Sequence, residues 1–165
     1  MTLIATTVAT PFGQMSLLGT ADCLHVAAFG NDLDDLRDRL PPALRGESVE
    51  RGETAAATAL RDYVAGDARA LDRVEVRQPG GPFHTAVWAE MRTIPPGTTV
   101  SYSELAARAG APRAVRAAAS ACARNAVCLF VPCHRVVRSD GSLGGYYYGL
   151  ATKRSILEHE RVTER

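Results

Sequence analysis

Hydrophobic and polar positions follow two different patterns along the chain, and the change lies near residue 80. Before it, short apolar runs bounded by turn residues predict strands, and apolar side chains at helical spacing predict two helices. The strands are expected over residues 6–9, 15–19, 24–29 and 71–76, and the helices over residues 32–40 and 54–65. This arrangement is typical of a small α/β unit.

Helical spacing dominates the second part of the chain, beginning with a predicted helix over residues 83–92. Ser101 and Glu104 form a capping box, a pattern that opens a helix, and that short helix is expected to end at Gly110. Proline favours the first turn of a helix, so Pro112 predicts the start of another, over residues 112–124. Two short helices joined by a tight turn predict a helix-turn-helix unit.

Residues 78–82, with the sequence Gln-Pro-Gly-Gly-Pro, are the best candidate for a boundary between these two parts. We therefore expect an N-terminal α/β support domain over residues 1–78 and a linker over residues 79–82. A mostly helical domain is expected over residues 83–165, which gives an α+β fold class in which the first domain packs on the second.

Composition is that of a folded domain, with 46% hydrophobic and 22% charged residues in 165. No apolar run approaches the ~20 residues that a membrane span needs, and no signal peptide opens the chain, so a cytoplasmic protein is expected. The cysteines, at positions 23, 122, 128 and 133, form no CxxC pair, which favours free thiols in a reducing compartment. No set of four zinc ligands is found, and no metal or cofactor is expected.

Charge is distributed unevenly, although the formal net charge is only +1. Residues 1–100 hold 9 arginines and 13 acidic residues, a net charge of −4, whereas residues 101–165 hold 9 arginines, one lysine and 5 acidic residues, a net charge of +5. Local fields act over about a Debye length, ~8–10 Å, so a local excess affects a partner more than the total does. The near-neutral total therefore does not exclude a nucleic-acid partner.

Basic residues also follow one side of the predicted helix over residues 112–124. Arg113, Arg116, Ser120 and Arg124 recur at helical spacing, with alanines around them. Such a helix can pack on an apolar core and present a narrow basic ridge to a groove of DNA. A solvated amphipathic helix without a partner is the alternative that this pattern leaves open.

The sequence places one cysteine beside a histidine, after an apolar run over residues 127–131 that predicts a buried strand or extended segment. Pro132 restricts the backbone there, so Cys133 is expected at a defined corner next to His134. A thiol is nucleophilic as its thiolate, and a neighbouring histidine is a usual proton acceptor. The dipeptide alone is equally compatible with an inert buried cysteine beside an incidental histidine.

The longer string Pro132-Cys133-His134-Arg135-Val136 resembles the active-site motif of the O6-alkylguanine-DNA alkyltransferases, also called methylated-DNA–protein-cysteine methyltransferases. The resemblance covers about residues 83–160, through the segments 83–88, 94–97, 100–106, 141–145 and 157–160 and the single positions Arg116 and Asn125. Residues 10–13 and 29–30 resemble the N-terminal domain of that family. The family's fold implies an RNase H-like N-terminal domain and a C-terminal winged helix-turn-helix domain.

The resemblance implies direct reversal of DNA damage. A member of this family flips O6-alkylguanine out of the duplex and transfers the alkyl group irreversibly, one molecule per lesion, to its own cysteine. The implied roles are Cys133 as acceptor, His134 as base through a water, Glu160 as the group that orients His134, Tyr102 as the donor to the guanine, and Asn125 as a hinge. The expected partner is the minor groove of double-stranded DNA; a monomer is expected, with cooperative binding on DNA left open.

Further residues are assigned by the same resemblance. Arg116 is expected to fill the gap left by the flipped base, and the other expected DNA contacts are Arg113, Ala117, Ala119, Ser120, Arg124, Tyr102 and Arg135. The alkyl pocket is expected to be lined by Cys122, Val136, Tyr146, Tyr147 and Tyr148. The sequence departs from the family at Tyr148, which replaces a glycine, and this predicts poor reaction with benzylated guanine.

Three other classes of function remain to be compared. A Cys-His-Glu hydrolase would use the same three residue types but would not explain the basic helix. A non-catalytic alkyltransferase-like damage sensor would lack the acceptor cysteine, which is present here. The repair half of a two-function transcriptional regulator is the third, although the chain carries no additional DNA-binding domain.

Overall fold

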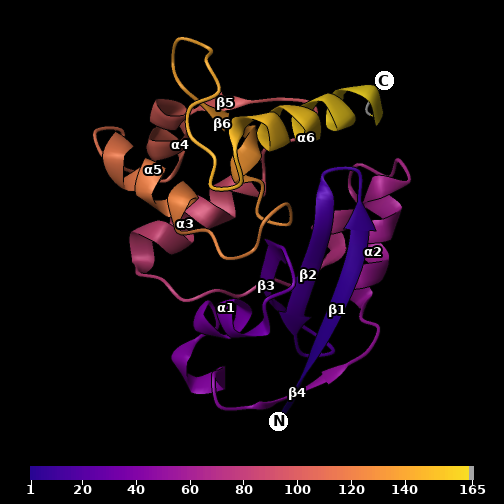
Figure 1. Cartoon of the computed structure of the whole chain (residues 1–165). Helices are drawn as coiled ribbons and strands as arrows, with labels where there is room; N and C mark the ends of the chain where they lie inside the picture. Colours follow the sequence, from indigo (N-terminus) through magenta and orange to yellow (C-terminus); the bar gives the residue numbers. More distant parts are fainter. Residues whose placement is uncertain (164–165) are drawn as a thin grey trace. The chain divides into compact units, whose positions relative to one another are not determined.

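The computed structural model describes residues 1–163 as a mixed α+β chain that forms two compact units (Figure 1). Unit 1 comprises Met1–Pro79 together with Ala126–Phe130, and unit 2 comprises Gly80–Asn125 together with the chain from Val131 onward. The mixture of helices and strands agrees with the expected fold class at that level.

Unit 1 is built on a four-stranded sheet with the order β3-β2-β1-β4. Its strands are β1 (Thr2–Thr10), β2 (Gly13–Gly19), β3 (Leu24–Phe29) and β4 (Ser48–Arg51). β1, β2 and β3 are antiparallel neighbours, whereas β4 pairs in parallel with β1. A two-residue connection joins β1 to β2, and Gly13 enters β2 with a φ of +130°, a conformation that glycine adopts without strain.

Two helices complete the core of unit 1. The short helix α1 (Leu33–Asp38) is capped by Asp32, and α2 (Ala55–Val64) is capped by Thr54, whose hydroxyl accepts from the amide of Ala57 at 3.2 Å. α2 packs on β1 with an alanine-rich face that includes the fully buried Leu60 and Tyr63. Small side chains allow the helix to lie close to the sheet.

One strand predicted for unit 1 is wrong, and another strand was missed. Residues 71–76 do not form a strand: Ala70–Arg73 is a 3-10 turn, and only Val76 makes a bridge, to Leu24. Strand β4 was not predicted, because its four residues are mostly exposed and polar and carry no apolar alternation.

The segment Ala126–Phe130 belongs to unit 1, although the predicted boundaries place it in the C-terminal domain. Ala27 of β3 donates to the carbonyl of Ala126 at 3.0 Å and accepts from the amide of Cys128 at 2.9 Å. The predicted extended segment is therefore present only around Val127, since Leu129 has a φ of +70° and turns the chain. All five residues are buried.

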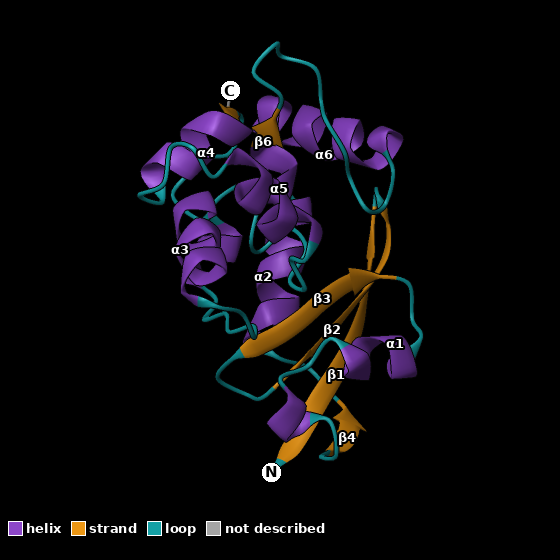
Figure 2. Ribbon diagram, turned by 90° about the vertical axis from the view of Figure 1, so that its left-hand side faces the viewer, coloured by secondary structure: helices purple, strands orange, loops and turns teal. Residues whose placement is uncertain are grey.

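Unit 2 contains four helices and a two-stranded sheet (Figure 2). The helices are α3 (Pro82–Met91), α4 (Tyr102–Arg108), α5 (Val115–Ala123) and α6 (Leu150–Thr163), and β5 (Val100–Ser101) pairs in parallel with β6 (Val136–Val137). The indole of Trp88 joins α3 to α5 by donating to the carbonyl of Ala121 at 2.9 Å. The predicted cap of α4 is confirmed, because the Ser101 hydroxyl accepts from the amide of Glu104 at 3.0 Å.

Helix α5 begins three residues later than predicted. A turn in which the amide of Ala114 donates to the carbonyl of Ala111 takes up the positions around Pro112, so that proline precedes the helix instead of opening it. The turn still joins α4 to α5 within a few residues.

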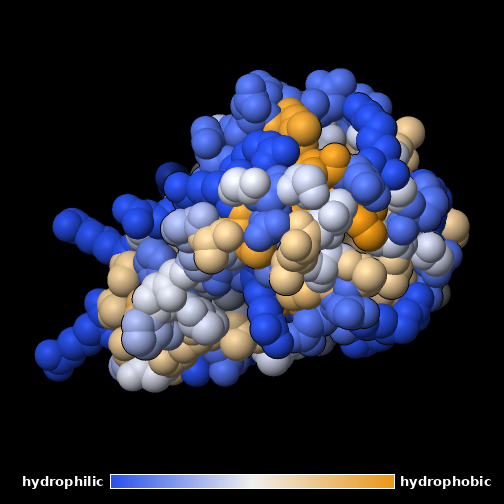
Figure 3. Space-filling model, turned by 90° about the horizontal axis from the view of Figure 1, so that it is seen from below, coloured by the Kyte–Doolittle hydropathy of each residue, from blue (hydrophilic) through white to orange (hydrophobic). Residues whose placement is uncertain are grey.

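The surface shown in Figure 3 is mainly hydrophilic, with separate apolar areas. Within residues 1–163, no helix is both long enough and apolar enough to cross a membrane. The large hydrophobic side chains that are exposed are spread along the chain, at Met1, Leu33, Val115, Tyr147, Leu150 and Val162.

Candidate active site

Cys133 opens a short 3-10 turn, Cys133–Arg135, directly after Pro132. Its sulfur lies 3.5 Å from the side-chain nitrogen of Asn125, which also donates to the carbonyl of Val131 at 2.8 Å. Asn125 therefore ties the end of the α5 region to the turn that carries the thiol. Loss of hydration raises the pKa of Cys133, while the hydrogen bond from Asn125 and the charge of Lys153 act in the opposite direction.

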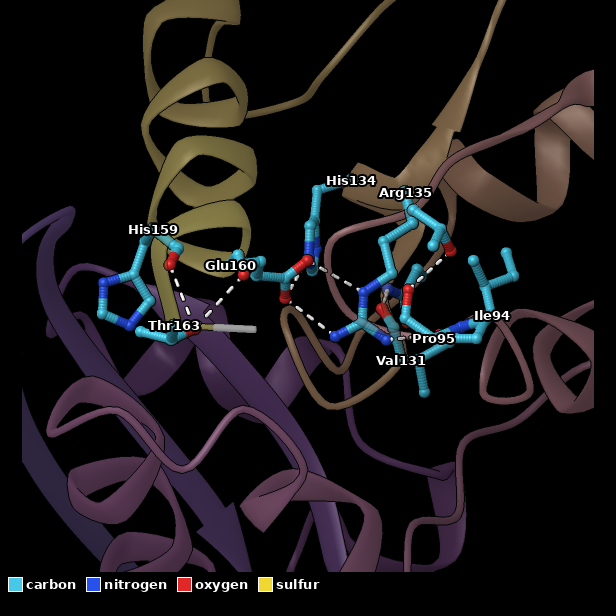
Figure 4. A network of polar contacts seen from close by, with 10 residues as sticks. Ile94, Pro95, Val131, His134, Arg135, His159, Glu160 and Thr163 are labelled. Carbon is cyan, nitrogen blue, oxygen red and sulfur yellow. Dashed lines mark hydrogen bonds and ion pairs between the residues drawn. The ribbon is translucent and has the colours of Figure 1, made fainter. Parts of the chain in front are cut away.

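The structure brings His134 and Glu160 together, as the sequence predicts (Figure 4). Both side chains are fully buried, and His134 Nε2 lies 2.9 Å from a carboxylate oxygen of Glu160 on α6. His134 Nδ1 has no hydrogen-bond partner among the described residues. The neighbouring His159 points away from this pair, and Thr163 donates to its backbone carbonyl.

Burial sets the protonation states of this pair. Desolvation lowers the pKa of His134, although Glu160 opposes this shift, so the imidazole is neutral near pH 7. Burial alone would raise the pKa of Glu160, but His134 and Arg135 together hold it well below its usual range. His134 is therefore a neutral base whose Nε2 is held by the carboxylate of Glu160.

Arg135 lies in a different place from the one expected. Its side chain is only 3% exposed, and its guanidinium donates twice to Glu160, through Nε at 3.0 Å and Nη2 at 2.7 Å. Its remaining amino group donates to the carbonyl of Ile94 at 2.7 Å. A guanidinium that is buried in this way is not available to contact DNA, so the expected role of Arg135 is corrected to that of a partner for Glu160.

Tyr102 and Cys122 approach the same thiol from α4 and α5. Burial and the nearby thiols of Cys122 and Cys133 raise the pKa of Tyr102 to about 12, so its hydroxyl stays protonated at neutral pH. Cys122 is partly exposed and free, and burial together with Cys133 raises its pKa far above the ordinary value. Tyr102 can donate a proton or a hydrogen bond, whereas Cys122 is a neutral thiol at neutral pH.

Lys153 is a site residue that the sequence reasoning missed. It is the only lysine of the chain, it lies on α6, and its side chain is fully buried. Its Nζ donates to the carbonyls of Val136, Leu143 and Gly145. The sequence carried one signal for this residue, a single lysine in a chain whose other basic residues are arginines. A buried site can require lysine in particular, because an ammonium group and a guanidinium group differ in shape and hydrogen bonding.

Apart from Cys122 on α5, the expected pocket residues lie on β6 and on the loop that follows it. Val136 is buried, Tyr147 is 74% exposed, and Tyr146 and Tyr148 lie between these extremes. The ring of Tyr148 makes edge contacts with Tyr146 at 5.9 Å and with Tyr147 at 5.0 Å between centroids. Gly144 has a φ of +73°, and a Cβ there would lie 3.0 Å from the Tyr102 ring, so the loop approaches Tyr102 closely.

The expected DNA-contacting residues form an exposed basic surface at α5. Arg113, Arg116 and Arg124 are exposed, and none of them forms an ion pair within residues 1–163. Ala117, Ala119 and Ser120 are partly exposed between them, whereas Ala118 and Ala121 are buried against the rest of unit 2. Small side chains would let this helix lie close to a nucleic-acid backbone.

Among the described residues, no three His, Cys, Asp or Glu side chains are grouped so that they could hold a metal ion. A thiol beside a neutral histidine, with a protonated tyrosine nearby, can perform nucleophilic displacement.

Comparison with known proteins agrees with this chemistry. The family model described as the 6-O-methylguanine DNA methyltransferase DNA-binding domain matches residues 82–162. The methylated-DNA–protein-cysteine methyltransferase of Mycobacterium tuberculosis is 35% identical over 156 residues, which is 94% of this chain and 90% of that protein. The bifunctional transcriptional activator/DNA repair enzyme Ada of Escherichia coli is 52% identical over 85 residues, and the match covers 52% of this chain but only 24% of Ada.

Solved structures show the same relation over nearly the whole chain. The crystal structure of the O6-methylguanine methyltransferase of Mycobacterium tuberculosis superposes with a TM-score of 0.77 at 32% identity, covering 98% of this chain and 94% of that one. A second crystal structure of the protein from this organism, in complex with DNA, gives a TM-score of 0.78 at 32% identity, with 97% and 94% covered. On these grounds the chain belongs to the methylated-DNA–protein-cysteine methyltransferase family.

Proposed function

We propose that this chain repairs DNA directly, by moving an alkyl group from O6 of a flipped guanine to its own Cys133. The observation that carries the proposal is the turn at Cys133, where a partly exposed thiol is followed by a neutral histidine. Glu160 holds one nitrogen of that histidine, and the other nitrogen, Nδ1, has no hydrogen-bond partner within residues 1–163.

Activation of the thiol follows from this arrangement. Buried polar nitrogens are rarely left unsatisfied, so a bound water is the expected partner of His134 Nδ1. That water would pass the proton of Cys133 to His134, while Glu160 stabilises the imidazolium that forms. The resulting thiolate is a soft nucleophile, which suits displacement at an alkyl carbon.

The leaving guanine needs a proton, and Tyr102 would supply it. Its raised pKa keeps the hydroxyl protonated, so Tyr102 can donate to a ring nitrogen as electron density moves onto the base. In balance, a sulfur–carbon bond forms and the carbon–O6 bond breaks with its electron pair left on guanine. Guanine takes the proton of Tyr102, and the thiol proton held on His134 returns through solvent to Tyr102, so that overall one proton moves from Cys133 to guanine. Hydrolysis does not readily cleave the thioether product, so each molecule acts once.

Recognition of DNA is assigned to the helix pair α4–α5, which would act as the helix-turn-helix of a winged domain. Arg113, Arg116 and Arg124 would contact the minor-groove side of the duplex, with Arg116 entering the stack in place of the flipped base. Unstacking a base costs a few kcal/mol, so a side chain that fills the gap stabilises the flipped state. Unit 1 would be the RNase H-like support domain, and the protein would act as a monomer on double-stranded DNA.

Intact mass spectrometry tests this function. After incubation with duplex DNA containing O6-methylguanine, the chain should gain a single methyl group that peptide mapping places on Cys133. The Cys133→Ser variant should gain none, whereas Cys23→Ser, which removes a thiol in unit 1, should behave as wild type. Absence of any mass change in the wild-type protein would rule the proposal out.

A further inference from the structure

Lys153 presents a problem that alkyl transfer to Cys133 does not itself explain. Its ammonium group is fully buried, and within residues 1–163 no carboxylate lies in ion-pair distance of it. A buried cation without a counter-ion is costly, so such groups are usually retained for a function.

The hydrogen bonds of Lys153 join two parts of the site. One goes to the carbonyl of Val136, at 2.7 Å, in the strand that directly follows the Cys133 turn. The other two go to Leu143 and Gly145, at either side of Gly144, in the loop that leads to the three tyrosines. An ammonium group has three donors and no acceptor, so three carbonyls satisfy it completely.

Replacement by a neutral side chain would not reproduce this arrangement. A glutamine amide offers two donors and an acceptor, which would face a carbonyl unfavourably. A methionine would leave three carbonyls without their donor. Lys153 therefore ties the loop that carries Gly144 past the Tyr102 ring to β6 and α6 through one charged group.

The same charge acts on the thiols of the site. Desolvation lowers the pKa of Lys153, and Arg138 acts in the same direction, whereas negative charge on Cys133 or Cys122 would raise it. Lys153 in turn lowers the pKa of Cys133. The other titratable groups around this thiol are Tyr102 on α4 and His134 in the turn itself.

We propose that Lys153 is a positioning residue for alkyl transfer, which holds the pocket loop against β6 and provides the counter-charge for the Cys133 thiolate. The proposal rests on the function given above. It adds that α6 contributes two groups to the reaction, Glu160 for the base and Lys153 for the nucleophile and the loop.

A comparison of Lys153→Met with Lys153→Arg separates charge from hydrogen bonding. In Lys153→Met, the pH midpoint for alkylation of Cys133 by iodoacetamide, followed by peptide mass spectrometry without DNA, should move to higher pH. Amide exchange over residues 138–149 should become faster, and methyl transfer should slow by roughly 10- to 100-fold, the factor expected for lost bonds to a charged group. Lys153→Arg should keep the midpoint while loosening the loop.

Arg154→Met is the matched control, since it removes an exposed charge from the next position of the same helix. It should leave the Cys133 midpoint and the loop exchange unchanged. If Lys153→Met reacted with the wild-type midpoint and the wild-type transfer rate, the proposal would be overturned.

A measurement on the wild-type chain covers the case in which Lys153→Met does not fold. Because the chain has one lysine, a sample labelled with ¹⁵N at lysine Nζ has a single side-chain signal. That signal should shift as Cys133 titrates, and it should lose this shift in Cys133→Ser. A lysine signal that does not shift as Cys133 titrates would contradict the proposal. Failure of methyl transfer would contradict only the proposed function, because neither the alkylation of Cys133 by iodoacetamide nor the ¹⁵N measurement on Lys153 needs DNA.

Discussion

At the scale of single residues, one carboxylate organises the candidate active site. Glu160 accepts from His134 and twice from Arg135, with all three side chains buried. The histidine and the arginine come from adjacent positions in the chain, so the sequence motif supplies both partners of a carboxylate that lies 25 residues further on. Arg135 therefore keeps Glu160 charged, and Glu160 keeps the histidine ring in place.

Replacing Arg135 by methionine should destabilise the protein strongly. The change removes the two hydrogen bonds that Arg135 donates to buried Glu160, and it also removes the bond that Arg135 donates to the carbonyl of Ile94. Breaking one side of a buried pair costs about 3–5 kcal/mol of unfolding free energy. Urea denaturation measures this loss, and Arg108→Met, which breaks an exposed pair with Glu104 on α4, should cost less than about 1 kcal/mol. Equal losses in the two variants would show that the buried network adds nothing.

The same network predicts how stability changes with pH. Folding lowers the pKa of both His134 and Glu160, so the unfolded chain binds more protons than the folded chain in acid. Stability should therefore be full above the ordinary histidine pKa of about 6.5. It should fall first below that pH and then further as the pH passes the ordinary glutamate value of about 4.3.

Denaturation curves measured between neutral pH and pH 4 would test this dependence. The Glu160→Gln variant should be less stable at neutral pH and should lose less stability on acidification, because its side chain no longer titrates. Stability that stayed constant from pH 7 to pH 5 would contradict the assigned state of His134.

At the scale of elements, the loop between β6 and α6 carries the three tyrosines that are expected to line the alkyl pocket. Its backbone is held by Lys153 and passes Tyr102 at Gly144, while Tyr148 packs between two other tyrosine rings. A side chain of that size at a position where relatives are expected to carry glycine leaves less room for a large adduct.

Tyr148→Gly should therefore react faster than wild type with O6-benzylguanine, by roughly tenfold if the ring obstructs the adduct at a cost of about 1.4 kcal/mol. The rate with duplex DNA containing O6-methylguanine serves as the comparison, because a methyl group needs little space and should be transferred at a similar rate by both proteins. Inactivation by O6-benzylguanine at the same rate in both proteins would show that Tyr148 does not restrict the pocket.

Most elements could be predicted from local patterns, and the failures have physical causes. β3 was predicted with its observed bounds, and the Ser101 cap of α4 was found from one four-residue pattern. β4 was not predicted, since its pairing with the distant strand β1 decides it, and the 3-10 turn at residues 70–73, which contacts α2, was predicted as a strand. In the site, His134 and Glu160 followed from a motif, whereas the burial of Arg135 and Lys153 depends on tertiary packing that no local pattern encodes.

At the scale of the whole molecule, charge follows the division into units. Unit 1 holds 8 arginines and 12 acidic residues, a net charge of −4, whereas unit 2 holds 11 basic and 6 acidic residues, a net charge of +5. Phosphate attracts the second unit and repels the first. Affinity for DNA without a lesion should therefore be modest, and strongly dependent on salt.

Salt titration of binding to undamaged duplex DNA measures this effect. Each phosphate contact contributes about −0.9 to the slope of log K against log salt, so Arg113→Gln should make the slope shallower by about one. Arg154→Gln removes the same charge from α6, outside the basic surface of α5, and should change the slope less. Identical slopes in the wild type and Arg113→Gln would remove Arg113 from the contact surface.

Helix α6 also determines when the thiol becomes competent. It follows Cys133 in the chain and provides both Glu160 and Lys153. A ribosome that has just released Cys133 has therefore made a nucleophile without its base-orienting carboxylate and without its counter-charge. If each molecule reacts only once, as proposed, this order of synthesis would keep the thiol from being alkylated before folding is finished.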